Sequence, residues 1–186
     1  MTMKKLLLNS LVAASVLFAV VSASDSGALA GLESRGGAAH ALGRPGKPTP
    51  LEGRCDPEAR GPDLAQRQQA AGADFFDILL RRHDVQTAFD KYIPGTYIQH
   101  NPTAQQGRAF AIPFIQGLFA PPAASSNITV FSGQGYVFAH HKYVQPDGRA
   151  VYAIMDYFRF QGTCLVEHWD VMQEITGDEP NPLAYF

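Results

Sequence analysis

The chain has few charged residues and no cluster of positive ones. Charged residues make up 17% of its 186 residues, and 15 Lys and Arg against 17 Asp and Glu give a formal net charge of −2. A surface that binds nucleic acid or an acidic membrane needs a basic excess or a run of Lys and Arg, and neither is present. The composition therefore favours a small molecule or another protein as the partner, and no nucleic acid.

Several motifs of enzyme chemistry are missing as well. There is no Gly-x-Ser-x-Gly segment for a nucleophile elbow, and no glycine-rich phosphate loop follows a predicted strand. His140, His168 and Asp170 contain ligand types that suit zinc or iron, but none of them are spaced four residues apart on a helix. We therefore expect neither nucleotide chemistry nor a metal.

Cysteine is scarce, with Cys55 and Cys164 only. In an oxidising compartment the two could form a disulfide. A free, buried Cys164 behaves as a small apolar residue and is the equally weighted alternative. The sequence leaves the choice open.

The N-terminus has the pattern of a secretory signal peptide. Lys4 and Lys5 precede an apolar run over residues 6–21, which is short for a membrane span, and small residues follow up to Ala23 and Ala30. We expect a signal peptide over residues 1–30, with cleavage after Ala23 or Ala30. The mature protein would be secreted or periplasmic, and not bound to a membrane.

Composition divides the remaining chain into two parts. Residues 31–62 are rich in Gly, Pro, Ala and Arg without hydrophobic periodicity, which indicates a flexible leader. Residues 63–186 then form one domain, and its helical start is marked by Asp63 with Gln66 three residues later, a spacing typical of a capping box.

Periodicity predicts helices in the first half of the domain and strands in the second. Helices are expected over residues 63–80, 84–92 and 109–119, although Pro113 leaves open a start of the third near Ile112. Strands are expected over residues 128–131, 135–145, 150–160 and 163–173. This order predicts an α+β domain, in which N-terminal helices pack on a curved antiparallel sheet that encloses a pocket.

Strand alternation sorts the side chains of the sheet onto two faces. Asp147-Gly148 is a two-residue hairpin signal, and a loop there pairs Ala139 with Asp156 and places His141 on the same face. A turn near Gly162 adds Phe158, Glu167 and Trp169 to that face. His140, His168 and Asp170 fall on the opposite face, toward solvent or a second subunit.

The first face has the character of a ligand pocket, because it is apolar with a few convergent polar groups. Burial raises the proton affinity of a carboxylate, which makes Asp156 a candidate general base. His141 could then donate a hydrogen bond to an oxyanion. Phe158 and Trp169 would form a flat wall for a planar ligand, with Glu167 shaping the pocket.

A second polar cluster lies in Tyr97-Ile98-Gln99-His100-Asn101-Pro102. Pro102 holds Asn101 extended, so that Tyr97, His100 and Asn101 are candidate ligand contacts at a pocket rim. A turn whose side chains cap nearby backbone amides is the alternative, with about equal weight.

These segments resemble the SnoaL-like polyketide cyclases of the nuclear transport factor 2-like superfamily. The likeness covers roughly residues 63–175 and is carried by the 97–102 cluster, by Asp156-Tyr157-Phe158-Arg159, and by Val166-Glu167-His168-Trp169-Asp170-Val171. It implies a cone-shaped α+β fold with a deep pocket, often dimeric, that works without cofactor or metal. Pro113 and the exported leader depart from the usual family pattern.

In the family, a strand aspartate removes an acidic proton during an aldol closure, and the matching position here is Asp156. His141 is similar to the family's strand histidine, although a β-bulge would exchange it with His140. The resulting hypothesis is a cofactor-free lyase or isomerase that acts on a small hydrophobic carbonyl compound, as a homodimer. The alternatives are a binding protein without catalysis and a protein whose sheet face docks another chain.

Overall fold

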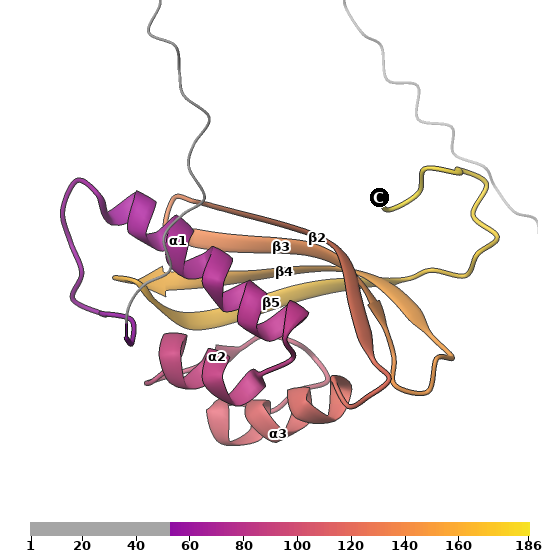
Figure 1. Cartoon of the computed structure of the whole chain (residues 1–186), viewed down its shortest axis with the longest axis horizontal. Coiled ribbons are helices and arrows are strands. Elements are labelled where there is room, and N and C mark those ends of the chain that lie inside the picture. Colours follow the sequence, from indigo (N-terminus) through magenta and orange to yellow (C-terminus); the bar gives the residue numbers. More distant parts are fainter. Residues whose placement is uncertain (1–52) are drawn as a thin grey trace, which may run out of the picture. The chain divides into compact units, whose positions relative to one another are not determined.

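The computed structural model describes residues 53–186 of the chain. The predicted signal peptide and the first part of the predicted leader, residues 31–52, lie outside the described residues. In the described region the helices and one short strand precede four long strands, and α1 (Leu64–Phe76) lies along one face of the sheet (Figure 1). Within it, no helix has both the length and the apolar content that a membrane crossing requires.

The helices begin and end close to the predicted positions. They are α1 (Leu64–Phe76), the π-helical turn η1 (Asp77–Arg81), α2 (Val85–Tyr92) and α3 (Arg108–Leu118). Asp63 occupies the N-cap position of α1, but its side chain makes no capping hydrogen bond, so the predicted capping box does not form. Asp84 does cap α2, because its Oδ1 accepts from the backbone N–H of Thr87 at 3.1 Å. Pro113 lies inside α3, so the later helix start near Ile112 is wrong.

The sheet has five strands in the order β1-β5-β4-β3-β2. They are β1 (Ile98–Gln99), β2 (Ala124–Gly133), β3 (Tyr136–Val144), β4 (Val151–Gln161) and β5 (Cys164–Glu174). β1 was not predicted and runs parallel to β5, whereas the other pairs are antiparallel. The sheet is therefore mixed rather than purely antiparallel, and β1 brings the 97–102 cluster beside β5.

The register between β3 and β4 is the predicted one. Ala139 pairs with Asp156 and His141 pairs with Ile154, as the loop at Asp147-Gly148 requires. His141 is 2% exposed and faces the helices, so that no bulge exchanges it with His140. His140 lies on the opposite face, where its ring stacks on Phe186.

The register between β4 and β5 differs from the prediction because β5 contains a bulge. Phe160 pairs with Leu165, but the next pair is Arg159 with Glu167, so that Val166 is an extra residue on β5. One extra residue in a strand moves every side chain after it to the opposite face of the sheet. Beyond the bulge Asp156 pairs with Asp170, and the prediction that Asp156 shares a face with Glu167 and Trp169 is wrong.

Residues 53–62, which we call the N-terminal strap, are bonded to residues at the start of β5. Cys55 and Cys164 form a disulfide, which resolves the open choice in favour of pairing. Asp56 exchanges two hydrogen bonds with Thr163, at 2.8 and 2.9 Å. Gly162 is essential to this contact, because its φ is +57° and an added Cβ would lie 2.2 Å from the Asp56 carbonyl oxygen. These residues of the predicted leader are therefore part of the domain's packing.

Candidate functional site

A pocket of about 360 Å³ lies between the helices and one face of the sheet. Its walls are largely apolar and come from η1, α3 and the strands. They include Leu80, Phe114, Ile115, Leu118, Phe119 and Phe158. A pocket of this size and lining suits a small, hydrophobic and partly planar ligand.

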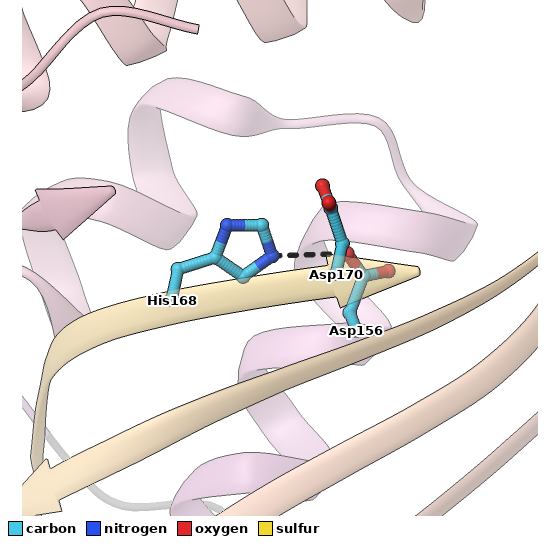
Figure 2. Close-up of side chains that lie close together, drawn as sticks. All are labelled: Asp156, His168 and Asp170. Carbon is cyan, nitrogen blue, oxygen red and sulfur yellow. Dashed lines mark hydrogen bonds and ion pairs between the residues drawn. The ribbon is translucent and has the colours of Figure 1, made fainter. Parts of the chain in front are cut away.

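Six of the polar side chains that line the same pocket are connected by hydrogen bonds. This polar cluster consists of Gln99, Asn101, His141, Asp156, His168 and Asp170. It is assembled from four strands or strand ends that lie side by side in the sheet. Figure 2 shows His168 and Asp170 of β5 near Asp156 on the neighbouring strand, with a hydrogen bond from the His168 ring to the Asp156 carboxylate.

The carboxylate of Asp156 lies between two imidazole rings. His141 Nε2 is 2.9 Å from its Oδ2, and His168 Nε2 is 3.0 Å from its Oδ1. His141 and His168 are buried, and Asp156 is 17% exposed at its side chain. Each carboxylate oxygen thus has its own imidazole partner, which fixes the Asp156 side chain in place.

Burial of Asp156 disfavours its charged form, as the sequence predicted, but this is not the deciding effect. The hydrogen bonds from His141 and His168, together with their positive charge when protonated, outweigh burial and hold the pKa of Asp156 well below its usual value. The expectation that burial makes Asp156 more basic is therefore wrong. Two nearby donors turn it into a stable anion.

The protonation of His168 follows from its second partner, Gln99. Gln99 Oε1 accepts from the backbone N–H of Asn101 at 2.9 Å, and a backbone N–H can only donate, so the oxygen of this amide is identified. His168 Nδ1 lies 2.9 Å from the same oxygen and must therefore donate to it. The remaining nitrogen, Nε2, faces Asp156, so a proton is held between these two groups.

His141 has a different environment. Its Nε2 faces Asp156, while its Nδ1 is buried without a hydrogen-bond partner among the described residues. A bare ring nitrogen costs less to bury than a charged ring with an unpaired N–H. His141 is thus best satisfied as a neutral ring that donates from Nε2 to Asp156.

Asp170 is held by one neutral group. Asn101 Nδ2 lies 2.9 and 2.7 Å from its two carboxylate oxygens. The amide of Asn101 is oriented in turn by Thr103, whose backbone N–H donates to Asn101 Oδ1 at 2.7 Å. No cationic side chain of residues 53–186 hydrogen-bonds to Asp170, which distinguishes it from Asp156.

The lowered pKa of Asp156 predicts that part of the protein's stability depends on pH. A carboxylate with a lowered pKa stabilises the fold above the unfolded value of about 4, and this contribution disappears as the pH falls through the folded value. We expect Asp156→Asn to lower the free energy of unfolding by about 3 kcal/mol at neutral pH. Urea unfolding at neutral and acidic pH should show the difference from wild type shrinking in acid, and a constant difference would contradict this assignment.

The predicted contact residues divide between the two faces of the sheet. Asp156, His141, Asn101, Tyr97 and Phe158 line the pocket. Glu167 and Trp169 do not, because the bulge at Val166 turns this part of β5 over. His100, which follows β1, does not line the pocket either.

The three excluded residues form a network of their own on the outer face. Glu167 accepts from Arg159 at 2.6 Å and lies 2.9 Å from His100 Nε2. The His100 ring stacks on Trp169, with centroids 4.6 Å apart. His100, Glu167 and Trp169 are therefore accounted for by ion pairing and ring stacking outside the pocket.

His168, Asp170 and Gln99 are pocket residues that sequence reasoning placed elsewhere or overlooked. The predicted strand alternation places His168 and Asp170 on the opposite face, and the prediction for the 97–102 cluster does not include Gln99 among the ligand contacts. The sequence signal that points to them is the run Glu167-His168-Trp169-Asp170. Because side chains alternate between the two faces of a strand, two of these four residues face the pocket in either register.

Asp156, His168 and Asp170 are also the described residues best placed to hold a metal ion. One ligand atom from each lies within 4.8 Å of the others. In the structure His168 Nε2 and Asp156 Oδ1 form a hydrogen bond with each other, so that each group already has a partner. The arrangement is complete as an acid–base network.

Comparison with solved structures finds proteins of similar fold. No family model matches the chain, and no curated protein matches it significantly. A solved structure from Kribbella flavida, described as a "putative ketosteroid isomerase", aligns with a TM-score of 0.50 at 12% identity, over 63% of this chain and 85% of that chain. TsrD from Streptomyces laurentii aligns with a TM-score of 0.46 at 14% identity, over 61% of this chain and 91% of that chain.

The likeness to the Kribbella flavida structure establishes the fold. The described residues 53–186 share an α+β, NTF2-like fold with that structure, in which three helices pack on a five-stranded mixed sheet. The fold expected from the resemblance to SnoaL-like proteins is thereby confirmed.

Proposed function

We propose that this protein is a SnoaL-like enzyme that transfers a proton next to a carbonyl group of a small hydrophobic molecule. The supporting observation is Asp156 between two imidazoles in an otherwise apolar pocket. Such a cluster supplies an anion, a cation and neutral donors at one place, as acid–base chemistry requires. The overall reaction would be an aldol-type cyclisation, an isomerisation or a dehydration, without a cofactor.

Tyr97 is the best placed donor for the oxygen of an enolate. Burial, and then the negative charges of Asp156 and Asp170, raise the pKa of its hydroxyl far above the ordinary value, so that it stays protonated. Gln99 Nε2 donates to its oxygen at 2.9 Å, which leaves the hydroxyl hydrogen for a ligand. His141 stays in the reaction centre as the partner of Asp156.

The proposal is tested with β-tetralone, a bicyclic ketone that matches the pocket in size and polarity. Its acidic carbon-bound protons exchange with deuterium through an enolate, which NMR follows without any further reaction. We expect the wild-type protein to accelerate this exchange well above the rate in buffer. Binding of β-tetralone with no acceleration would instead support the alternative of a non-catalytic binding protein, which a fully hydrogen-bonded Asp156 also permits.

Two phenylalanines on α3 test whether the ligand occupies the pocket. Phe114 lines the pocket. Phe110, one turn earlier on the same helix, stacks on the ring of Phe114 but does not line the pocket. We expect Phe114→Ala to raise the dissociation constant of β-tetralone about tenfold, because an apolar contact is lost. Phe110→Ala is the matched control and should leave it within about twofold of wild type. Equal effects in a binding titration would place the ligand elsewhere.

Export and dimerisation are part of the proposal. The Cys55–Cys164 disulfide supports a secreted or periplasmic location, where such bonds persist. A homodimer would use the outer face of the sheet, where Phe131 is 50% and Val171 is 69% exposed. Sedimentation equilibrium of the mature chain tests this, and a monomer mass at high concentration would reject it.

A further inference from the structure

The pocket has a second polar end, at its opening. Gln145 directly follows β3 and Tyr152 lies near the start of β4, and both residues line the pocket and are partly buried. Across the sheet Tyr152 pairs with Tyr143, whose hydroxyl donates to the Leu118 backbone carbonyl at 2.6 Å. Leu118 and Met172 are exposed residues of the pocket wall, so this end faces solvent. We call Gln145 and Tyr152 the mouth pair.

The mouth pair lies well away from the polar cluster along the strands. Tyr152 and Asp156 are four residues apart on β4, so they share the pocket face with Ile154 between them. Four residues of a strand span about 13 Å at roughly 3.3 Å per residue. His141 and Gln145 have the same separation along β3 and its end. A ligand long enough to reach both ends therefore meets polar groups at each end and apolar walls between them.

The mouth pair is held in place by the backbone and is free to bind a ligand. Gln145 is fixed on both sides, because its N–H donates to the Ala150 carbonyl at 3.1 Å and its carbonyl accepts from the Gly148 N–H at 2.9 Å. Its side-chain amide and the Tyr152 hydroxyl make no hydrogen bond to another of residues 53–186, whereas the neighbouring Tyr143 hydroxyl is already paired. A hydroxyl and a primary amide together supply donors and an acceptor, which suit either a hydroxyl or a carbonyl oxygen.

Charge restricts what the mouth pair can bind. The pocket wall contains the carboxylates of Asp156 and Asp170 but no Lys or Arg of residues 53–186. At the opening, burial and then the charge of Asp147 raise the pKa of the Tyr143 hydroxyl, which indicates a negative potential at this end as well. Arg149, which pairs with Asp147 at 3.7 Å, has 86% of its side chain exposed and does not line the pocket. An anionic group on a ligand would therefore find no cation in the pocket wall to compensate it.

We propose that Gln145 and Tyr152 form a specificity subsite, which binds an uncharged oxygen at the end of the ligand farthest from the reacting carbonyl. The inference rests on the proposed function for the reacting end. The ligand is then an elongated, neutral ring compound with a carbonyl at the polar cluster and a hydroxyl or second carbonyl at the mouth pair. A carboxylate or phosphate at the distal position is rejected.

Calorimetric titration with 6-hydroxy-β-tetralone tests the subsite, because its hydroxyl and carbonyl lie at opposite ends of the two rings. We expect the wild-type protein to bind it about tenfold more tightly than β-tetralone, since it gains hydrogen bonds to the mouth pair. Tyr152→Phe and Gln145→Met should each reduce this preference to about threefold or less and leave the affinity for β-tetralone within about twofold. Tyr157→Phe is the matched control on the outer face of the same strand and should keep the full preference.

A charged analogue, 6-carboxy-β-tetralone, tests the restriction to neutral ligands. It should bind at least about tenfold more weakly than the hydroxy compound at neutral pH. Equal wild-type affinity for β-tetralone and its 6-hydroxy derivative, a full preference retained by Tyr152→Phe or Gln145→Met, or tight binding of the carboxylate would each overturn the subsite. None of these results affects the deuterium exchange that tests the proposed function. The expected preference without any accelerated exchange would instead reject the proposed function and support the subsite as a binding site alone.

Discussion

Replacing Asp156 by asparagine is expected to slow β-tetralone exchange by about a hundredfold or more. An asparagine is nearly the same size, but its amide nitrogen would face one of the two imidazole N–H groups as a second donor. The charge that holds the proton of His168 is removed as well. The pocket would keep its shape and lose the electrostatic field that stabilises an enolate.

The affinity for β-tetralone separates this effect from general damage. We expect the Asp156→Asn variant to bind the probe within about threefold of wild type, because the apolar walls that contact the rings are unchanged. Glu174→Gln is the matched control, since it neutralises an exposed carboxylate at the end of the same sheet. An Asp156→Asn variant that exchanges the probe at the wild-type rate would show that the polar cluster takes no part.

Removing the disulfide should destabilise the chain by about 2–5 kcal/mol. Cys55 and Cys164 are 109 residues apart in sequence, so the bond restricts a long loop of the unfolded chain. It also holds the N-terminal strap over Gly162, where the backbone contact is too close for any side chain. Urea unfolding of a Cys55→Ser, Cys164→Ser variant measures the loss.

Reductant provides the control for this prediction. Dithiothreitol should lower the stability of the wild-type protein to that of the double serine variant and should leave the variant unchanged. Titration of the unfolded, unreduced wild-type chain should find no free thiol. Two free thiols, or a wild-type stability that reductant does not change after full reduction, would contradict the role given to this bond.

Local sequence signals were sufficient for the helices and for one hairpin. Asp84 and Tyr92 bracket an amphipathic segment that forms α2, and the Asp147-Gly148 loop sets the whole register of β3 with β4. That register places His141 and Asp156 in the pocket. Both features depend on residues that are close in the chain, which is why the sequence reveals them.

The face of β5 could not be derived in the same way. Val166 is an apolar residue in an apolar stretch, and nothing in its neighbours marks it as a bulge. The bulge is favoured by long-range contacts: it lets Leu165 pack in the core and also brings His168 within reach of Gln99 and Asp156. Because of this one extra residue, His168 and Asp170 line the pocket instead of the predicted Glu167 and Trp169.

The acidity of Asp156 was misjudged for a related reason. Burial was visible from strand alternation and correctly opposes the charged form. The second imidazole was not visible, because His168 reaches Asp156 only after the bulge. A pKa depends on the full set of partners, and two of the contacts that orient His168 and Asp170 come from the short strand β1 and its C-terminal end.

The central claim is that a ligand's oxygen and reacting carbon meet the polar cluster within the apolar pocket. A crystal structure with β-naphthol, a planar mimic of the β-tetralone enol, tests it most directly. The account predicts rings against Phe114 and Leu80, the ligand oxygen in hydrogen-bond contact with Tyr97 or an imidazole, and the adjacent carbon beside the carboxylates of the polar cluster. β-Naphthol bound on the outer face, or in the pocket with its oxygen turned away from these groups, would contradict it.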